Sequence, residues 1–277
     1  MAFDPDDLAA LDDMAGFLDL LGLSVERLTG RECRRLEPML APAVRGGLLV
    51  AGDAWVDPRR VVAALLAVLG ERVVPGRVVG LELAGDAVRG VRLASGETIS
   101  ARTTVLAAGA WSGALDGLPP GLLPPVRPVK GQILRLRSPR PLLSRCVRGM
   151  VHGSPAYLVP RRDGELVLGA TQEELGFDTR VTAGGLYELL RDARELVPGI
   201  TELELTDVVA GLRPGTPDNL PVIGPAGPEG LMLATGHHRG GVLLAPLTAE
   251  ALWPEGLDEE ARQVLAACSP ERFGART

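Results

Sequence analysis

The stretch that decides the fold of this chain is Ala210-Gly-Leu-Arg-Pro-Gly-Thr-Pro-Asp218, followed further along by Gly236-His-His-Arg-Gly-Gly-Val-Leu-Leu-Ala-Pro246. The first part places Arg213 at the end of an apolar strand, beside a Pro-Gly turn. The second part is a loop with paired glycines that leads into an apolar helix, so its backbone N–H groups can face a ligand. Together they predict a ligand-binding segment near the C-terminal end.

Helix signals are distributed along the rest of the chain. An aspartate followed by proline, the usual N-cap and first helical residue, occurs at Asp4-Pro5 and again at Asp57-Pro58. Thr29 with Glu32 three residues later forms a capping box. The predicted helices cover residues 4–22, 29–37, 57–70, 185–197 and 241–253.

Strand signals fall between these helices. Gly85-Asp86 and Arg162-Asp163-Gly164 are turns that predict two hairpins, 78–83 with 87–93 and 157–160 with 165–169. Four further strands are predicted at 103–109, 129–136, 203–213 and 231–234. The predicted fold class is therefore mixed α/β, with antiparallel hairpins interleaved among buried strands. The middle of the chain, about 125–204, should form a sheet distinct from the one that holds Val105 and Leu233.

Composition excludes several classes of protein. The chain has 277 residues, enough for a substantial core, and a formal net charge of −6, which argues against a nucleic-acid partner. Its three cysteines are widely spaced and predict neither a disulfide framework nor a redox motif. No apolar run reaches the roughly 18 residues of a membrane span. The N-terminal segment is acidic where a signal peptide would be basic, so we expect a cytoplasmic protein without membrane contact.

Two side chains are candidates for holding a small anion. The guanidinium of Arg213 matches a carboxylate in two parallel bonds, and its apolar strand suggests a partly dry setting. A structural salt bridge is the alternative role for this arginine. Tyr157, one of only two tyrosines, opens a strand and could bond a carboxylate through its phenol, with ordinary packing as the alternative.

The loop 236–241 is the third candidate. The helix that follows directs the positive end of its dipole at the loop, which suits a group that gains negative charge. His237 and His238 are adjacent, and His152 is the only other histidine, so we expect no metal site. Ser112 lacks the glycine that a nucleophile elbow needs and is expected to cap the turn after the Val105 strand.

In their order along the chain, several motifs resemble the D-amino-acid-oxidase-like flavoproteins, and most closely the glycine oxidases of thiamine biosynthesis. The motifs are Val56-Asp57-Pro58-Arg59, Thr104-Val-Leu-Ala-Ala-Gly-Ala-Trp-Ser112, Val129-Lys-Gly-Gln132, Tyr157-Leu-Val-Pro-Arg161, Leu168-Gly-Ala-Thr171, Gly211-Leu-Arg-Pro-Gly-Thr216, Gly236-His-His-Arg-Gly-Gly241 and Ser269-Pro-Glu-Arg-Phe273. Each motif alone is weak, and their shared order makes the resemblance specific.

The resemblance implies an FAD-dependent oxidase of glycine or a similar small amino acid. Hydride would pass from the substrate Cα to the flavin, O2 would accept the electrons to give H2O2, and the imine would supply thiazole formation. Arg213 would bind the substrate carboxylate, with Tyr157 supporting it and Arg239 nearby. The residues implied to contact FAD are Val78, His237, His238, Arg239, Gly240, Gly241, Val242 and Leu243.

The resemblance also implies a discontinuous organisation. Residues 1–50 and 125–205 would form a substrate domain with an antiparallel sheet, and 51–124 with 206–277 the remainder of a Rossmann-like FAD-binding domain. A homo-oligomer is compatible with it. The segment after Arg213 has no cysteine, unlike sarcosine oxidases that attach flavin covalently, so FAD would be noncovalent.

One expected motif is not found in this sequence. The family opens with a βαβ unit whose Gly-x-Gly-x-x-Gly turn seats the pyrophosphate of FAD, and the present sequence resembles the region downstream of that unit. We expect this unit to lie on a longer gene product. The alternatives are a subunit whose partner chain completes the FAD site, and a non-catalytic remnant.

Overall fold

The structure is a computed structural model that describes residues 1–118, 121–122, 125–151, 153–253 and 257–273. It is mixed α and β, as predicted. The chain divides into two compact units, and it passes between them several times. Unit 1 comprises Met1–Val56, Gly131–Glu173 and Thr179–Gly211, and unit 2 comprises Asp57–Lys130, Glu174–Asp178 and Leu212–Thr277.

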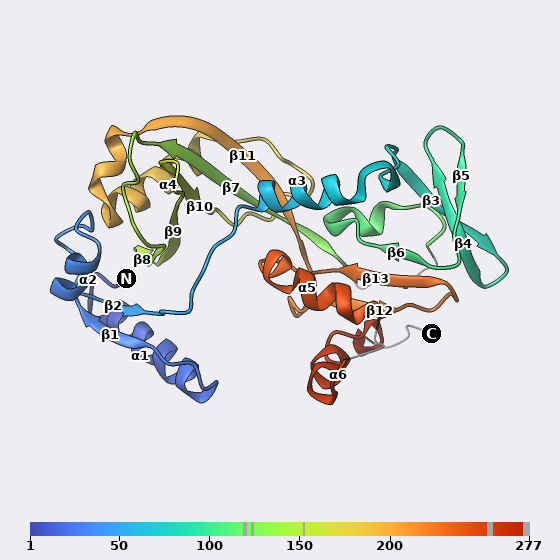
Figure 1. The fold of residues 1–277 in the computed structure, drawn as a ribbon, viewed down its shortest axis with the longest axis horizontal. Helices are drawn as coiled ribbons and strands as arrows, with labels where there is room; N and C mark the ends of the chain where they lie inside the picture. Colours follow the sequence, from blue (N-terminus) through green and yellow to red (C-terminus); the bar gives the residue numbers. More distant parts are fainter. Residues whose placement is uncertain (119–120, 123–124, 152, 254–256, 274–277) are drawn as a thin grey trace. The chain divides into compact units, whose positions relative to one another are not determined.

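Each predicted α-helix is present and begins within two residues of its predicted start. The α-helices are α1 (Pro5–Leu20), α2 (Gly30–Leu36), α3 (Pro58–Leu69), α4 (Ala183–Leu196), α5 (Gly241–Ala251) and α6 (Glu259–Ala266), of which α6 was not predicted (Figure 1). Asp4 and Asp57 cap α1 and α3 with their side chains, and Thr29 with Glu32 forms the capping box of α2. These caps satisfy backbone N–H groups that would otherwise lack acceptors, which fixes the helix starts.

The strands include both predicted hairpins. They are β1 (Glu26–Thr29), β2 (Gly46–Leu49), β3 (Val78–Ala84), β4 (Ala87–Leu93), β5 (Thr98–Ser100), β6 (Thr104–Leu106), β7 (Arg127–Arg137), β8 (Val147–Val151), β9 (Ser154–Pro160), β10 (Glu165–Gly169), β11 (Glu204–Gly215), β12 (Val222–Pro225) and β13 (Leu231–Thr235).

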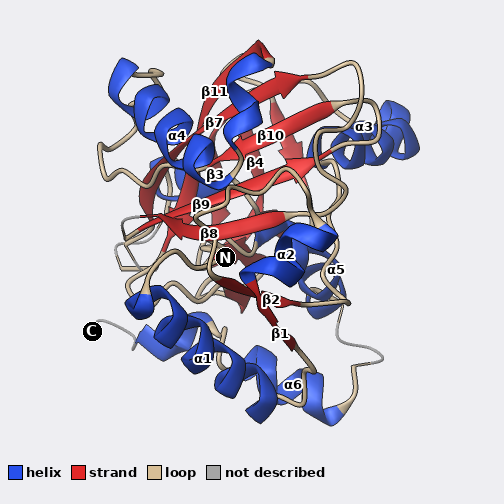
Figure 2. Cartoon of the chain, turned by 90° about the vertical axis from the view of Figure 1, so that its left-hand side faces the viewer, coloured by secondary structure: helices blue, strands red, loops and turns tan. Residues whose placement is uncertain are grey.

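Unit 1 is built on a five-stranded sheet of order β11-β7-β10-β9-β8. Within this sheet β7 pairs antiparallel with β10, β10 with β9, and β9 with β8. Helix α4 packs against this sheet through Leu189, Ala193 and Leu196, which are buried in one core with strand residues such as Leu134 and Leu158 (Figure 2). The antiparallel sheet predicted for the middle of the chain is therefore present.

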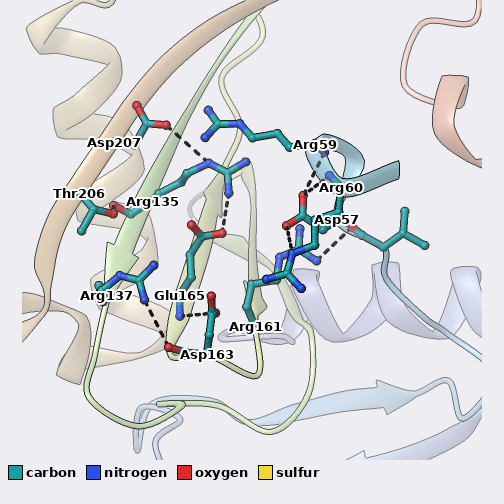
Figure 3. A network of polar contacts seen from close by, with 11 residues as sticks. Asp57, Arg59, Arg60, Arg135, Arg137, Arg161, Asp163, Glu165, Thr206 and Asp207 are labelled. Atoms are coloured by element: carbon teal, nitrogen blue, oxygen red, sulfur yellow. Dashed lines mark hydrogen bonds and ion pairs between the residues drawn. The ribbon is translucent and has the colours of Figure 1, made fainter. Parts of the chain in front are cut away.

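A polar network ties three strands of unit 1 together (Figure 3). The buried guanidinium of Arg135 on β7 forms ion pairs with Glu165 on β10 and with Asp207 on β11. The hydroxyl of Thr206 donates to the Arg135 carbonyl at 3.0 Å. Because a buried guanidinium is stable only when it is paired, this network specifies the register of the three strands.

Unit 2 holds two small sheets, β12-β13-β6 and β3-β4-β5. Strands β13 and β6 run parallel, with Met232 opposite Val105, and their core includes Leu106, Val222 and Leu233. Strand β6 is shorter than the predicted 103–109, because the chain turns into a 3-10 helix at Gly109. Ser112 lies inside that 3-10 helix, where its hydroxyl donates to the Gly109 carbonyl at 2.8 Å, and no side chain caps the start of the helix among the described residues.

Helix α3 of unit 2 has no buried residue. Its exposed large apolar side chains are Val61, Val62, Leu65, Leu66, Val68 and Leu69, with exposures from 40% to 78%. Across the described ranges, no helix has the length and apolar character needed to cross a membrane.

Candidate functional site

Arg213 lies near the end of β11, in unit 2, and is half-buried. Its Nη1 donates to the carbonyl oxygen of Lys130 on β7, at 3.5 Å. The side chain of Lys130 is fully buried. The guanidinium therefore extends from the rigid end of a paired strand, where its position is set by the sheet.

The turn that follows β11 is fixed by its own polar groups. The Thr216 hydroxyl lies 2.8 Å from the carbonyl oxygen of Leu220 and 3.1 Å from Oδ1 of Asp218. Asp218 Oδ1 also accepts from the backbone N–H of Leu220 at 3.0 Å. Asn219, inside the turn, takes a left-handed φ of 58°, which asparagine tolerates better than most residues.

The loop 236–240 packs directly on this turn. Gly236 has a φ of 74°, and a Cβ at this position would lie 2.6 Å from Cγ2 of Thr216, so only glycine fits. Two residues on, the backbone N–H of His238 donates to the carbonyl oxygen of Pro214 at 2.9 Å. The loop is therefore bonded to the residue that follows Arg213.

The two histidines of the loop have different surroundings. Nε2 of His237 lies 2.9 Å from the hydroxyl of Thr248 on α5, and burial lowers the pKa of this imidazole. His238 has a left-handed φ of 46°, and its Nε2 is buried without a hydrogen-bond partner among the described residues.

Positive charge surrounds His238. Burial is the main cause that lowers the pKa of this imidazole, and Arg213, Arg239 and Arg127 lower it further. The ring is therefore neutral near pH 7, and the charge around it comes from guanidinium groups. Such a place favours a ligand that carries a negative charge.

Helix α5 begins at the end of the same loop. Its N-cap is Gly240, and no side chain within the described part of the chain caps it. By helix geometry, the first N–H groups of α5 have no acceptor inside the helix. Val242 and Leu243 in its first turn are exposed, at 54% and 83%. The helix start thus presents backbone donors beside apolar side chains.

Tyr157 belongs to unit 1, where it lies on β9 opposite Gly169 of β10. A Cβ at Gly169 would lie 2.3 Å from the phenol oxygen of Tyr157, so the glycine gives the ring room across the neighbouring strand. The side chain is half-buried. Sequence and sheet together therefore fix the place of this phenol within unit 1.

The predicted site residues thus separate into groups. Arg213, His238 and Arg239 come together in unit 2, with Gly240, Gly241, Val242 and Leu243 beginning α5 beside them. Val78 starts β3 in another part of unit 2, opposite Leu93. Where the structure describes the chain, no three His, Cys, Asp or Glu side chains are grouped to hold a metal ion.

Sequence reasoning missed two arginines that shape this site. Arg127 starts β7 and donates through Nη1 to the carbonyl oxygen of Thr216. Arg272 forms a bidentate ion pair with Asp218. The turn composition Thr216-Pro-Asp218 was visible in the sequence, but nothing local indicates which arginines it binds.

A family model described as FAD dependent oxidoreductase, DAO, matches residues 1–253. The chain belongs to this family. That match covers most of the sequence, and the mixed α/β fold agrees with it.

Named relatives of the chain include three kinds of protein. It is 36% identical to hydrogen cyanide synthase subunit HcnC of Pseudomonas aeruginosa, over 90% of this chain and 60% of that protein. It is 38% identical to glycine oxidase of Geobacillus kaustophilus, over 82% of this chain and 60% of the relative. It is 36% identical to bifunctional protein ThiO/ThiG of Trichormus variabilis, over 86% of this chain and 36% of that protein.

A solved structure shows the same fold. The crystal structure of glycine oxidase from Geobacillus kaustophilus matches with a TM-score of 0.85 and 32% identity, over 100% of this chain and 74% of that one. The chain spans about 60% of the length of HcnC and of the Geobacillus glycine oxidase in the sequence comparison.

Proposed function

We propose that this chain provides the substrate-binding and part of the FAD-binding structure of an oxidase acting on glycine or a similarly small amino acid or amine. The observation that carries the proposal is the group Arg213, His238 and Arg239 beside the uncapped start of α5. It combines cationic side chains for a carboxylate with backbone donors for a cofactor. The relatives named glycine oxidase support this class of substrate.

The residues of unit 2 fit a flavin. The N–H groups of Gly241, Val242 and Leu243 at the start of α5 are suited to a ring that becomes more negative on reduction, and the exposed Val242 and Leu243 offer apolar contact to it. The loop from His237 to Gly240 and the main chain of Val78 would complete the contacts from this chain. Bound noncovalently, FAD would take two electrons from the substrate and O2 would reoxidise it to give H2O2.

Arg213 is proposed to bind and orient the substrate carboxylate. A bidentate guanidinium fixes both the position and the plane of a carboxylate, so the Cα–H bond of the substrate is held in one direction. Tyr157 of unit 1 is proposed as a second ligand to the carboxylate, and Arg239 as a neighbouring cation. Because the imidazole of His238 is neutral, the cationic groups beside it are guanidinium groups, which do not titrate near pH 7.

We assign unit 1 to the substrate domain and unit 2 to the FAD-binding domain. As in the glycine oxidases of thiamine biosynthesis, the imine product is proposed to feed thiazole formation. The three cysteines are free, which agrees with a cytoplasmic site of action.

A second candidate is a subunit that needs a partner chain to complete its FAD site. It is favoured by the relative named hydrogen cyanide synthase subunit HcnC, which matches over 90% of this chain. In that case the chain would provide the substrate and α5 contacts, and the partner would provide the pyrophosphate-binding turn.

The test is anaerobic mixing of the purified chain and FAD with glycine, sarcosine or D-alanine, followed by flavin absorbance. Bleaching by a small amino acid is expected if the chain acts alone. A colourless protein that stays inactive with added FAD would exclude activity of this chain by itself and favour the subunit. Equal bleaching by methylamine, which has no carboxylate, would contradict the role of Arg213 as the carboxylate ligand.

Arg213 supplies the matched mutational test. In the protein that reduces flavin, Arg213→Ala is expected to raise KM for the amino acid by roughly 10- to 100-fold, because charged hydrogen bonds contribute about 1.5–3 kcal/mol. The KM of Arg213→Lys should lie between those of the parent and of Arg213→Ala, since lysine keeps the charge and loses the planar fork. An unchanged KM in the alanine variant would remove the assigned role.

A further inference from the structure

Two arginines from distant parts of unit 2 hold the turn after β11. Arg127 at the start of β7 donates to the Thr216 carbonyl, and its Nη2 lies 3.3 Å from Oδ1 of Asn219. Arg272 lies in a short 3-10 helix, Pro270–Phe273, and approaches the same turn from the C-terminal segment. One turn is therefore bonded to segments that lie about 90 and 50 residues away.

Asp218 is the centre of this arrangement. Its Oδ2 accepts from Nε of Arg272 at 2.9 Å, and its Oδ1 accepts from Nη2 at 3.2 Å. The same Nη2 donates to the carbonyl oxygen of Leu220 at 2.9 Å, and Nη1 donates to the carbonyl oxygen of Ser269 at 3.2 Å. Arg272 is well covered, with 15% of its side chain exposed. This two-pronged pair is more rigid than a surface contact between flexible charged side chains.

The turn is connected to Arg213 in two ways. Thr216 is fully buried and follows Arg213 by three residues on the same strand end. The methyl group of Thr216 also faces Gly236, and the loop that begins there is bonded to Pro214 through the N–H of His238. A displacement of the turn would therefore move Arg213 relative to His238.

We propose that Arg272 and Asp218 are positioning residues, which hold the end of β11 so that the guanidinium of Arg213 keeps one place beside the loop 236–240. The inference rests on the proposed function, in which Arg213 binds the substrate carboxylate. Neither Arg272 nor Asp218 is assigned a direct contact with the carboxylate. Their effect passes through Thr216, Pro214 and the close contact at Gly236.

The imidazole of His238 reports this geometry without any cofactor or ligand. Arg213, Arg239 and Arg127 disfavour its protonated form, so its pKa responds to their distance from the ring. The direct effects of the two lost charges have opposite signs, because Arg272→Gln removes a positive charge and Asp218→Asn a negative one. A rise of the His238 pKa in both variants therefore reports a movement of the groups around it. The chain has three histidines, so their imidazole signals are resolved in an NMR titration against pH.

We expect Arg272→Gln and Asp218→Asn to raise the pKa of His238, because the mutually repelling guanidinium groups separate when the turn is released. The expected rise is about half a pKa unit, or threefold in the proton-binding constant. Arg272→Lys should give a smaller change. The control is Arg262→Gln on α6. It removes an arginine whose Nη1 lies 3.4 Å from Oε2 of Glu259, and it leaves the turn intact.

A second measurement follows the binding of acetate, the simplest carboxylate probe. The dissociation constant is expected to rise about fivefold or more in Arg272→Gln and Asp218→Asn, and to stay within twofold in Arg262→Gln. Circular dichroism selects the variants that fold. Asp218→Asn keeps the shape of the side chain and provides the test if Arg272→Gln does not fold.

Two outcomes would overturn the positioning role. One is a His238 pKa that stays unchanged or falls in the folded Arg272→Gln and Asp218→Asn proteins. The other is a rise of equal size in Arg262→Gln. Absence of acetate binding in the parent chain would count against Arg213 as the carboxylate ligand, and so against the proposed function, while the His238 measurement would still decide the positioning role.

Discussion

The carboxyl group of Asp218 is held in its charged form by its neighbours. Hydrogen bonds from Arg272 are the main cause, with further ones from Leu220 and Thr216, and they lower the pKa of Asp218 from 3.8 to about 2. A carboxyl group whose pKa is lower in the folded than in the unfolded protein stabilises the folded state at pH values above its unfolded-state pKa. That stabilisation is lost as the pH falls from about 4 towards 2.

We therefore predict that Asp218→Asn lowers the free energy of unfolding at pH 5 by about 1 kcal/mol, a figure reduced for solvent screening because 38% of the side chain is exposed. The deficit should shrink at pH 3, where the parent has begun to lose the same contribution. Urea unfolding of both proteins at the two pH values measures it. A deficit of equal size at pH 3 would show that the charge of Asp218 is not the source.

Sequence alone predicted some of these residues and not others. Arg213 was found because the strand that carries it is apolar and the turn after it is local in sequence. The partnership of Arg272 with Asp218 could not be predicted in the same way, since it joins residues far apart and any of many charged side chains would satisfy the aspartate. The left-handed backbone of His238 likewise depends on its bond to Pro214.

At the scale of elements, local chemistry decided most of the correct predictions. Asp4, Asp57 and the Thr29–Glu32 box start helices through bonds within a few residues. Glycines at positive φ, Gly85 and Gly164, close the two hairpins. The sequence did not predict β1, β2, β5, β8 and β12, which are short. Of these, β1, β2 and β8 depend on partner strands elsewhere in unit 1.

The close contact between the loop 236–240 and the end of β11 is an element-level feature that can be tested directly. Gly236→Ala is predicted to destabilise the protein by about 1–3 kcal/mol, because the added Cβ meets Thr216 and the positive φ is unfavourable for alanine. Gly211→Ala, on β11, is the control, since a Cβ there meets nothing within 4 Å. Thermal or urea unfolding compares the two, and equal stability of both variants would contradict the close contact.

At the scale of the whole molecule, each unit has its own hydrophobic core. The mixed α/β class was predictable because the hairpin and helix periods are clear in the sequence. The exposure of α3 could not be predicted, since its apolar residues are typical of a helix that packs on a sheet. Six large apolar side chains of this helix are exposed, and large exposed apolar patches mark interaction surfaces.

In the purified chain, the partner available to α3 is another copy, so we predict concentration-dependent self-association through this helix. Replacing Val62, Leu65 and Leu69 with glutamine should shift the sedimentation profile towards the monomer, because burial of apolar area at about 25 cal/mol per Å² is the force that drives association. The free energy of unfolding should change by less than about 1 kcal/mol, since these side chains are exposed at 45% to 59% and glutamine retains helix propensity.

Analytical ultracentrifugation over a range of concentrations measures the self-association, and urea unfolding measures the stability of the same variant. If the variant associates as strongly as the parent, α3 is not the surface that joins the copies; if it loses several kcal/mol of stability, the helix packs within its own unit.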